Sequence, residues 1–210
     1  MDLKVSFARP VGPYDMLWNK CTGKFCHVEL SIEIDRELFR VMVDTNISTS
    51  YNPSILEGIM KRTKESELKK LNVCFYVMWG EVVSLRYLSE LSEDPFPSPP
   101  TQPVYETITI PMELEEMQSI IGYSLRQLGK PYDIPRAILL FSHVTLRIEG
   151  EPEQFFCSQL IMHTLKEAGI YKNEIEALKD INHMSPVAAY EWLSKQDHKR
   201  IKPGDGESKE

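Results

Sequence analysis

The sequence predicts an α+β protein whose antiparallel sheet packs on a helix that carries a cysteine. Polar and apolar residues alternate over residues 27–34, and Phe39, Val41 and Val43 then alternate with Arg40, Met42 and Asp44. This period of two is typical of half-buried strands. From Phe156 onward the apolar residues instead recur at helical spacing. This run ends at Gly169, a residue type that adopts the left-handed conformation after a helix at no steric cost. The 210 residues suffice to bury the core of one domain, which we expect to span residues 1–197.

The first half of the chain is expected to supply most of the strands. Proline and glycine at positions 10–13 end a first short strand. An amphipathic helix with a charged end comes later, and a strand rich in aromatic and β-branched residues follows it. The next segment fits a strand and a helix equally well. These four elements are expected at residues 3–8, 53–71, 73–79 and 82–91.

The two alternating segments predict a hairpin, with residues 35–37 turning the chain. Because side chains alternate along a strand, His27 shares a face with the even-numbered positions of the second strand. A two-residue loop places His27 opposite either Asp44 or Asn46, depending on the register.

The second half of the chain is expected to be mainly helical. Five prolines fall within residues 92–103, which we expect to form an extended surface loop, either a passive spacer or a docking site for a protein partner. Gly129 closes a helix, and Ser185 and Pro186 begin the last one. The tail at residues 198–210 is polar and expected to be disordered. The other elements are expected at residues 104–110, 111–128, 134–141, 153–169 and 173–180.

Composition and motifs exclude several classes of function. A net charge of −7 argues against general nucleic-acid binding, which needs a basic surface. The four cysteines are widely spread and do not resemble a disulfide scaffold. We find no signal peptide, lipidation motif or membrane span, so we expect a cytoplasmic protein. Nucleotide-binding and H-E-x-x-H motifs are also absent, and we expect neither a cofactor nor a metal.

Cys157 is the candidate nucleophile. It falls in the first turn of the predicted helix, where unpaired backbone N–H groups and the positive end of the helix dipole favour the thiolate. It also falls on the apolar side of that helix. Taken alone, such a cysteine is more often a packed core residue than a nucleophile.

A cysteine nucleophile requires a base and a third group that fixes the orientation of the base. Of the five histidines, only His27 lies on a predicted strand with a carboxylate, Asp44, across the hairpin. His163 is on the cysteine helix but points to another face. The alternative for His27 is a solvent-facing side chain on the polar face of the sheet.

Two other arrangements of cysteine and histidine are weaker. A zinc site made of Cys21, Cys26 and His27 lacks the paired C-x-x-C spacing. A dyad of Cys26 with His143 would place its thiol at the start of a strand instead of the start of a helix.

Five short motifs occur along the chain in a recognisable order. They are His27-Val28-Glu29-Leu30, Val43-Asp44, Leu128-Gly129-Lys130-Pro131-Tyr132-Asp133, Phe156-Cys157-Ser158-Gln159-Leu160, and Ser185-Pro186 followed by Tyr190-Glu191-Trp192-Leu193. In this order they resemble the circularly permuted branch of the NlpC-type papain-like superfamily. That branch includes lecithin:retinol acyltransferase relatives, bacterial YiiX-like proteins and viral homologues. Glu29 departs from the small residue often found there, and Gln159 stands where an acidic residue is common.

The resemblance implies a papain-like domain and a thiol hydrolase or peptidase that acts through an acyl-enzyme. Cys157 would be the nucleophile, His27 the general base and acid, and Asp44 the orienting residue, with Asn46 as the alternative. Tyr132 would lie near the substrate cleft, and the substrate would be a peptide, an amide or an acyl ester. The alternatives are a lipid-directed acyltransferase of the same fold and a non-catalytic interaction protein on a papain-like scaffold.

Overall fold

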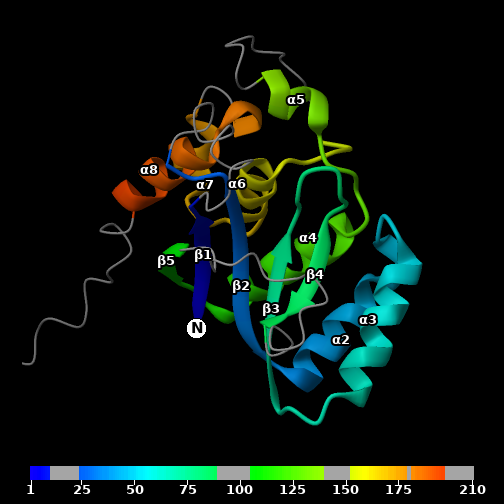
Figure 1. Ribbon diagram of the computed structural model, residues 1–210. Coiled ribbons are helices and arrows are strands. Elements are labelled where there is room, and N and C mark those ends of the chain that lie inside the picture. The colour runs from blue at the N-terminus through cyan, green and yellow to red at the C-terminus, as the bar shows by residue number, and fades with distance from the viewer. Residues whose placement is uncertain (10–23, 89–104, 140–151, 179–180, 197–210) are drawn as a thin grey trace, which may run out of the picture.

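The computed structural model describes residues 1–9, 24–88, 105–139, 152–178 and 181–196, and Figure 1 shows its elements in chain order. The strands are β1 (Asp2–Ala8), β2 (His27–Asp35), β3 (Lys70–Tyr76), β4 (Ser84–Tyr87) and β5 (Tyr105–Pro111). The α-helices are α2 (Arg36–Asn46), α3 (Pro53–Glu65), α4 (Leu114–Gln127), α5 (Ile134–Leu139), α6 (Cys157–Glu167), α7 (Lys172–Glu176) and α8 (Pro186–Gln196). Two short 3-10 helices, η1 (Ile47–Thr49) and η3 (Ile181–His183), complete the described elements.

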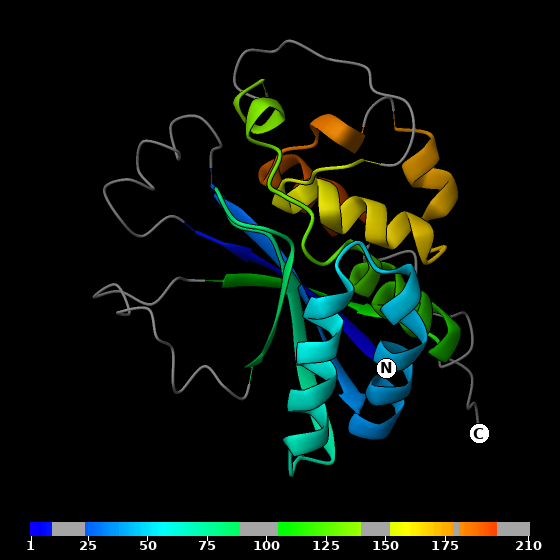
Figure 2. The same cartoon turned by 90° about the vertical axis from the view of Figure 1, so that its right-hand side faces the viewer.

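The protein is α+β, with an open five-stranded antiparallel sheet packed against helices. The strand order is β4-β3-β2-β1-β5, which places β2 in the centre. Val5 of β1 pairs with Leu30 of β2, and Leu30 pairs with Phe75 of β3. All three side chains are fully buried in the hydrophobic core. Figure 2 shows α2, α3, α4 and α6, coloured from blue to yellow, on one side of the sheet, where they cover this apolar face.

The opposite face of the sheet is polar. Because side chains alternate along a strand, His27, Glu29 and Ser31 share this face of β2. The register places Cys74 of β3 beside Ser31 and Arg86 of β4 beside Cys74. Glu29 and Ser31 are buried although both are polar. A buried charge requires a partner, so this face is where an organised polar site is expected.

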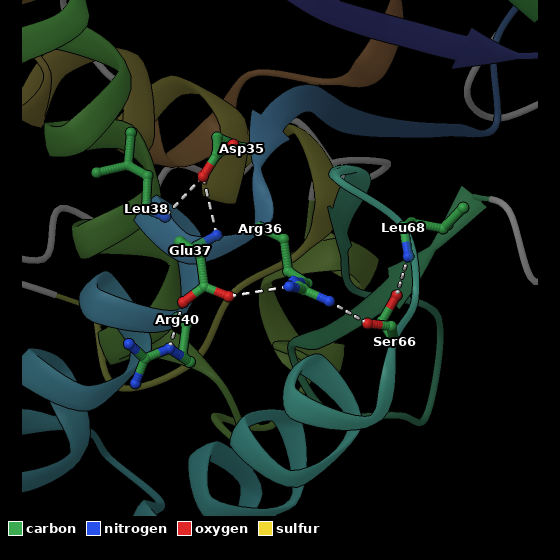
Figure 3. A network of polar contacts seen from close by, with 7 residues as sticks. All are labelled: Asp35, Arg36, Glu37, Leu38, Arg40, Ser66 and Leu68. Atoms are coloured by element: carbon green, nitrogen blue, oxygen red, sulfur yellow. Dashed lines mark hydrogen bonds and ion pairs between the residues drawn. The ribbon is translucent and has the colours of Figure 1, made fainter.

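The predicted hairpin is wrong, because the residues after Asp35 form helix α2 instead of a second strand. Figure 3 shows how that helix begins. The Asp35 Oδ1 atom accepts hydrogen bonds from the backbone N–H groups of Glu37, at 2.9 Å, and Leu38, at 3.1 Å. The Arg36 side chain meanwhile donates a hydrogen bond to the Ser66 carbonyl beyond the end of α3. Asp35 therefore acts as a helix cap, where the sequence pattern suggested a turn.

The pattern at residues 39–44 satisfies two periods at once. Phe39, Val41 and Val43 alternate as in a strand, but Phe39, Met42 and Val43 also follow the i, i+3, i+4 spacing of a helix. In the structure the helical set is buried, whereas Val41 is 50% exposed. The helical period is therefore the one that the fold uses.

Most of the other predicted elements are confirmed, although their first and last residues differ from the predicted ones by several positions. The predicted helix at residues 53–71 ends at Glu65, and the ambiguous segment at 82–91 contains the short strand β4. The Ser185 hydroxyl accepts a hydrogen bond from the backbone N–H of Ala188 at 3.2 Å, as expected for an N-cap. The proline-rich segment at residues 92–103 and the tail at 198–210 lie outside the described residues.

Gly129, after α4, occupies a position that only glycine fits well. Its φ is +90°, and a Cβ atom there would lie 2.9 Å from the Cβ of Asn52. The chain that follows α4 therefore packs closely against the start of α3. Among the described helices, none is both long and apolar enough to cross a membrane.

Candidate active site

Helix α6 presents Cys157 as its first residue. The residue before it, Phe156, is extended and buried, and its backbone N–H donates to the Gln159 Oε1 atom at 3.4 Å. The first turn of a helix has backbone N–H groups without partners inside the helix, and they carry the positive end of the helix dipole. Cys157 is only 4% exposed, so its thiol lies at this electropositive end and away from bulk water.

Polar side chains on α6 lock the helix to the segment before α8. The Asn182 Oδ1 atom accepts a hydrogen bond from Gln159 Nε2 at 2.9 Å and lies 2.9 Å from His163 Nε2. The Ser158 hydroxyl donates to the Met184 carbonyl at 2.6 Å. His163 and Gln159 therefore tie α6 to this segment through Asn182, and Gln159 supports the first turn that holds Cys157.

His27 contacts Cys157. It is the first residue of β2, a strand against which α6 packs, and its side chain is 16% exposed. Burial opposes a charge on the imidazole, but the hydrogen bonds and negative charges of Cys157 and Glu29 outweigh it and raise the pKa of His27 to about 9. An imidazole with such a pKa is an imidazolium at neutral pH, which is the state that stabilises a neighbouring thiolate.

The third member of this cluster is Glu29. Its Oε2 atom lies 3.7 Å from His27 Nε2 and accepts a hydrogen bond from Arg86 Nη2 at 2.7 Å. Burial favours the neutral acid, but His27 and Arg86 together lower the pKa of the Glu29 carboxyl below its ordinary value. Glu29 is therefore a carboxylate that faces the candidate base from the same strand.

The structure does not bring Asp44 or Asn46 to His27. The proposed role of Asp44 depended on the hairpin, and this residue is instead exposed on the last turn of α2. Asn46 Nδ2 donates to the Met42 carbonyl at 2.8 Å, and Asn46 Oδ1 accepts from Arg126 of α4 at 3.3 Å. The carboxylate that sequence reasoning missed, Glu29, was visible in the pattern, since residues i and i+2 of a strand share a face.

Tyr132 lies near Cys157. Its backbone pairs with Phe155, two residues before Cys157, and its N–H donates to the Glu81 carbonyl at 2.9 Å. Burial and the negative charge of Cys157 raise the pKa of the Tyr132 phenol, so the hydroxyl stays protonated. The exposed Trp79 ring lies 5.4 Å from the Tyr132 ring, centroid to centroid. Tyr132 therefore lies between the electrostatic influence of Cys157 and an exposed aromatic ring.

Asp133, which follows Tyr132, acts as a helix cap. Its Oδ1 atom accepts a hydrogen bond from the backbone N–H of Arg136 at 3.0 Å, and its Oδ2 atom pairs with the guanidinium of the same arginine at 3.0 Å. Asp133 therefore holds the start of α5 in place.

The other described cysteines differ from Cys157. Cys26 Sγ lies 3.5 Å from the Ala8 carbonyl at the start of β2. Cys74 is fully buried, and burial raises the pKa of its thiol. Neither begins a helix. Cys21 and His143 lie outside the described residues, and in the part of the chain that the structure describes, no group of three or more His, Cys, Asp or Glu side chains is arranged to hold a metal ion.

The site is thus a thiol at a helix start, an imidazole at a strand start and a buried carboxylate on the same strand. The chain matches no protein-family model, and neither a curated protein nor a solved structure matches it significantly. The functional argument therefore comes from the geometry of these side chains.

Proposed function

We propose that the protein is a thiol-dependent hydrolase that cleaves an amide or ester bond through an acyl-enzyme. The observation that carries the proposal is the contact of His27 with both Cys157, at the start of α6, and the carboxylate of Glu29. The candidate base, His27, therefore lies between the candidate nucleophile, Cys157, and the orienting carboxylate, Glu29, which is the arrangement that nucleophilic catalysis requires. The assignment of Glu29 as the third residue replaces that of Asp44.

Each residue has a distinct role in the proposed reaction. The Cys157 thiolate attacks the substrate carbonyl carbon and forms a C–S bond, while the carbonyl oxygen gains the negative charge. The backbone N–H of Cys157 points from the helix start toward that oxygen and contributes to an oxyanion hole. As the C–N or C–O bond breaks, the His27 imidazolium gives its proton to the leaving group.

Hydrolysis of the acyl-enzyme reverses these roles. His27, now neutral, takes a proton from a water molecule as the water oxygen attacks the thioester carbonyl. The C–S bond then breaks, the carboxylic product leaves, and Cys157 is again paired with the imidazolium. Glu29 stabilises the charged imidazole in both halves of the cycle without itself taking a proton.

The proposed fold is the permuted papain-like one. Two features support it: a histidine-bearing strand that precedes a cysteine-bearing helix in the chain, and the packing of that helix on a central strand of an antiparallel sheet. Among known arrangements, the circularly permuted NlpC-type branch combines these features in this chain order. A fold alone hosts many functions, so the thiol chemistry needs its own test.

Tyr132 and Trp79 are the proposed contacts for the substrate. Tyr132 is close enough to Cys157 to feel its charge, and the Trp79 ring, which is 45% exposed, packs against Tyr132, so an apolar group next to the scissile carbonyl finds an aromatic surface there. A peptide or amide with such a group fits this surface, and so does an acyl ester. A lipid-directed acyltransferase would use the same residues but pass the acyl group to a second substrate instead of water.

The test is the rate at which iodoacetamide labels each cysteine between pH 5 and 9, read by mass spectrometry. At pH 6 we expect Cys157 to react on the order of 100-fold faster than Cys74, because thiolates react and burial keeps the Cys74 thiol protonated. His27→Ala should remove most of this advantage. Asp44→Asn is the matched control, because Asp44 is exposed on α2, and it should change nothing.

The outcomes separate catalysis from a binding role. Slow labelling of Cys157 at every pH, with no effect of His27→Ala, would contradict the proposal and favour a non-catalytic scaffold. Selective labelling justifies a screen with activated esters and amides. Release of the free acid identifies a hydrolase, whereas a product that appears only with an added acceptor identifies an acyltransferase.

A further inference from the structure

A second charged residue, Arg86, reaches the candidate site from the other side of Glu29. Arg86 lies on β4, and β3 separates that strand from β2. Its Nη2 atom donates to the Glu29 Oε2 atom at 2.7 Å, and this is the same oxygen that lies 3.7 Å from His27 Nε2. A single carboxylate oxygen therefore stands between the guanidinium and the imidazole.

The guanidinium of Arg86 is itself held in place. Its central carbon lies 5.0 Å from the centroid of the Tyr76 ring on β3, and the guanidinium donates a hydrogen bond to the Tyr105 hydroxyl on β5. The Arg86 side chain is 28% exposed and that of Glu29 is 9% exposed, so the pair is shielded from water. A planar guanidinium fixed on two sides leaves the carboxylate little freedom to rotate.

We propose that Arg86 is a positioning residue, which fixes the Glu29 carboxylate against His27 and so keeps the imidazole oriented and charged beside Cys157. The inference rests on the proposed function, and it adds a residue from outside the Cys–His–Glu cluster. Arg86 contacts neither the thiol nor the imidazole in this arrangement. Its whole effect on the reaction passes through Glu29.

The groups around Glu29 and His27 allow the positioning role to be told apart from a simple charge effect. Arg86 is the cation that contacts Glu29, and a cation acting only through space would lower the pKa of His27. Removing it would then raise that pKa. Loss of positioning has the opposite sign, because a carboxylate that turns away no longer stabilises the imidazolium. The titratable groups near this pair are Cys157 on α6, Cys74 and Tyr76 on β3, and Tyr105 on β5. On β1, Ser6 and Ala8 lie opposite Glu29 and His27, and the charged Lys4 lies on the same face opposite Ser31.

The experiment is an NMR titration of the histidine ring protons in the full chain, with the His27 resonance assigned by its loss in His27→Gln. In the wild-type chain we expect His27 to titrate near 9. Glu29→Gln and Arg86→Met should each lower this value by about one pH unit or more. Arg86→Lys should restore at least half of the difference. In the double variant the value should equal that of Glu29→Gln, because Arg86 acts through Glu29.

A control ion pair joins β3 to the central strand β2. Lys70 Nζ on β3 lies 2.7 Å from Glu33 Oε1 on β2, and both side chains are exposed. Lys70→Met therefore removes a lysine–glutamate contact without touching Glu29, and it should leave the His27 titration unchanged. Thermal melting of each variant shows whether it is folded. If Arg86→Met does not fold, Arg86→Lys and Arg86→Gln give the same comparison.

Three outcomes are distinguishable. A His27 pKa that stays unchanged or rises in Arg86→Met would overturn the positioning role and leave the proposed function intact. A further fall in the double variant below Glu29→Gln would also overturn it, because Arg86 would then act directly on the imidazole. A wild-type His27 that titrates near its ordinary value of 6.5, with an unreactive Cys157, would instead contradict the proposed function.

Discussion

Helices α2 and α6 begin in different ways. A side chain caps the start of α2, whereas the start of α6 has no such cap and carries the candidate reactive thiol. At the start of α2, Asp35 accepts hydrogen bonds from two backbone N–H groups. An acidic residue in the first turn, Glu37, complements the positive end of the helix dipole. At the start of α6 the preceding residue is Phe156, whose side chain accepts no hydrogen bond. The positive end of α6 is therefore left for the Cys157 thiol, and a carboxylate there would instead compete with it.

The two starts also differ in how they are held. Asp35 is local, since its partners lie two and three residues away. Cys157 is held by residues distant in the chain: Asn182 through Gln159, Tyr132 through its pairing with Phe155, and His27 on the central strand. A local cap stabilises a helix in any context, whereas a site assembled from distant segments exists only in the folded protein.

The largest expected effect concerns the start of α6, where titration of His27 should make the unfolding free energy depend on pH. The folded-state pKa of His27, about 9, lies above the ordinary value of 6.5. Its contribution is therefore fully present below pH 6.5 and is lost as the pH rises through 9. The free energy of unfolding should fall by up to about 3 kcal/mol over this window. Urea unfolding at several pH values measures it.

Replacement of His27 by Gln provides the reference for that measurement. The variant lacks the titrating imidazole, so its unfolding free energy should vary less over the same pH range. Parallel pH curves for the two proteins would show that the imidazolium does not stabilise the fold.

Gln159→Ala should disturb α6 with a smaller effect. Gln159 is fully buried, and the change leaves the Phe156 N–H without its side-chain acceptor and removes one donor from Asn182. We expect a loss of about 2 kcal/mol in unfolding free energy. Because the first turn loosens, iodoacetamide labelling of Cys157 should also slow. A stable variant with wild-type labelling would show that Gln159 does not support the position of Cys157.

Asp35→Ala should have the smallest effect and should sharpen the comparison. Removal of an N-cap typically costs about 1 kcal/mol, which urea unfolding resolves. Labelling of Cys157 should be unchanged, because the cap lies at the opposite end of β2 from His27. Altered labelling in this variant would mean that the two helix starts are coupled through the central strand. Asp35→Asn, which retains an accepting oxygen, is the matched control.

The cysteine helix and the histidine strand were predictable because each carries a clear local period. The apolar residues of α6 recur at helical spacing, and those of β2 alternate so regularly that His27 could be placed on a strand from the chain alone. Gly129 and Ser185 were equally predictable, since turn and cap preferences act over a few residues. The α+β class followed from these elements.

Local patterns failed for the segment that follows β2. Residues 39–44 fit both periods, and packing against α3 and α4 chose the helix. With that choice, Asp44 moved away from the site, and Glu29 became the carboxylate beside the base. A one-dimensional pattern specifies which face a side chain is on, but the partner across the face depends on strand order and register.

The sequence by itself determined that a cysteine begins a helix, that a histidine begins a strand, and that both belong to an α+β domain. Only the tertiary structure decided that these two residues meet, that Glu29 is the carboxylate beside His27, and that Arg86 from a strand two positions away in the sheet holds it. The physical reason is range. Hydrogen bonds of caps and turns join near neighbours in the chain. Glu29 and Arg86 are instead 57 residues apart in the sequence, and only the packed sheet brings their side chains into contact.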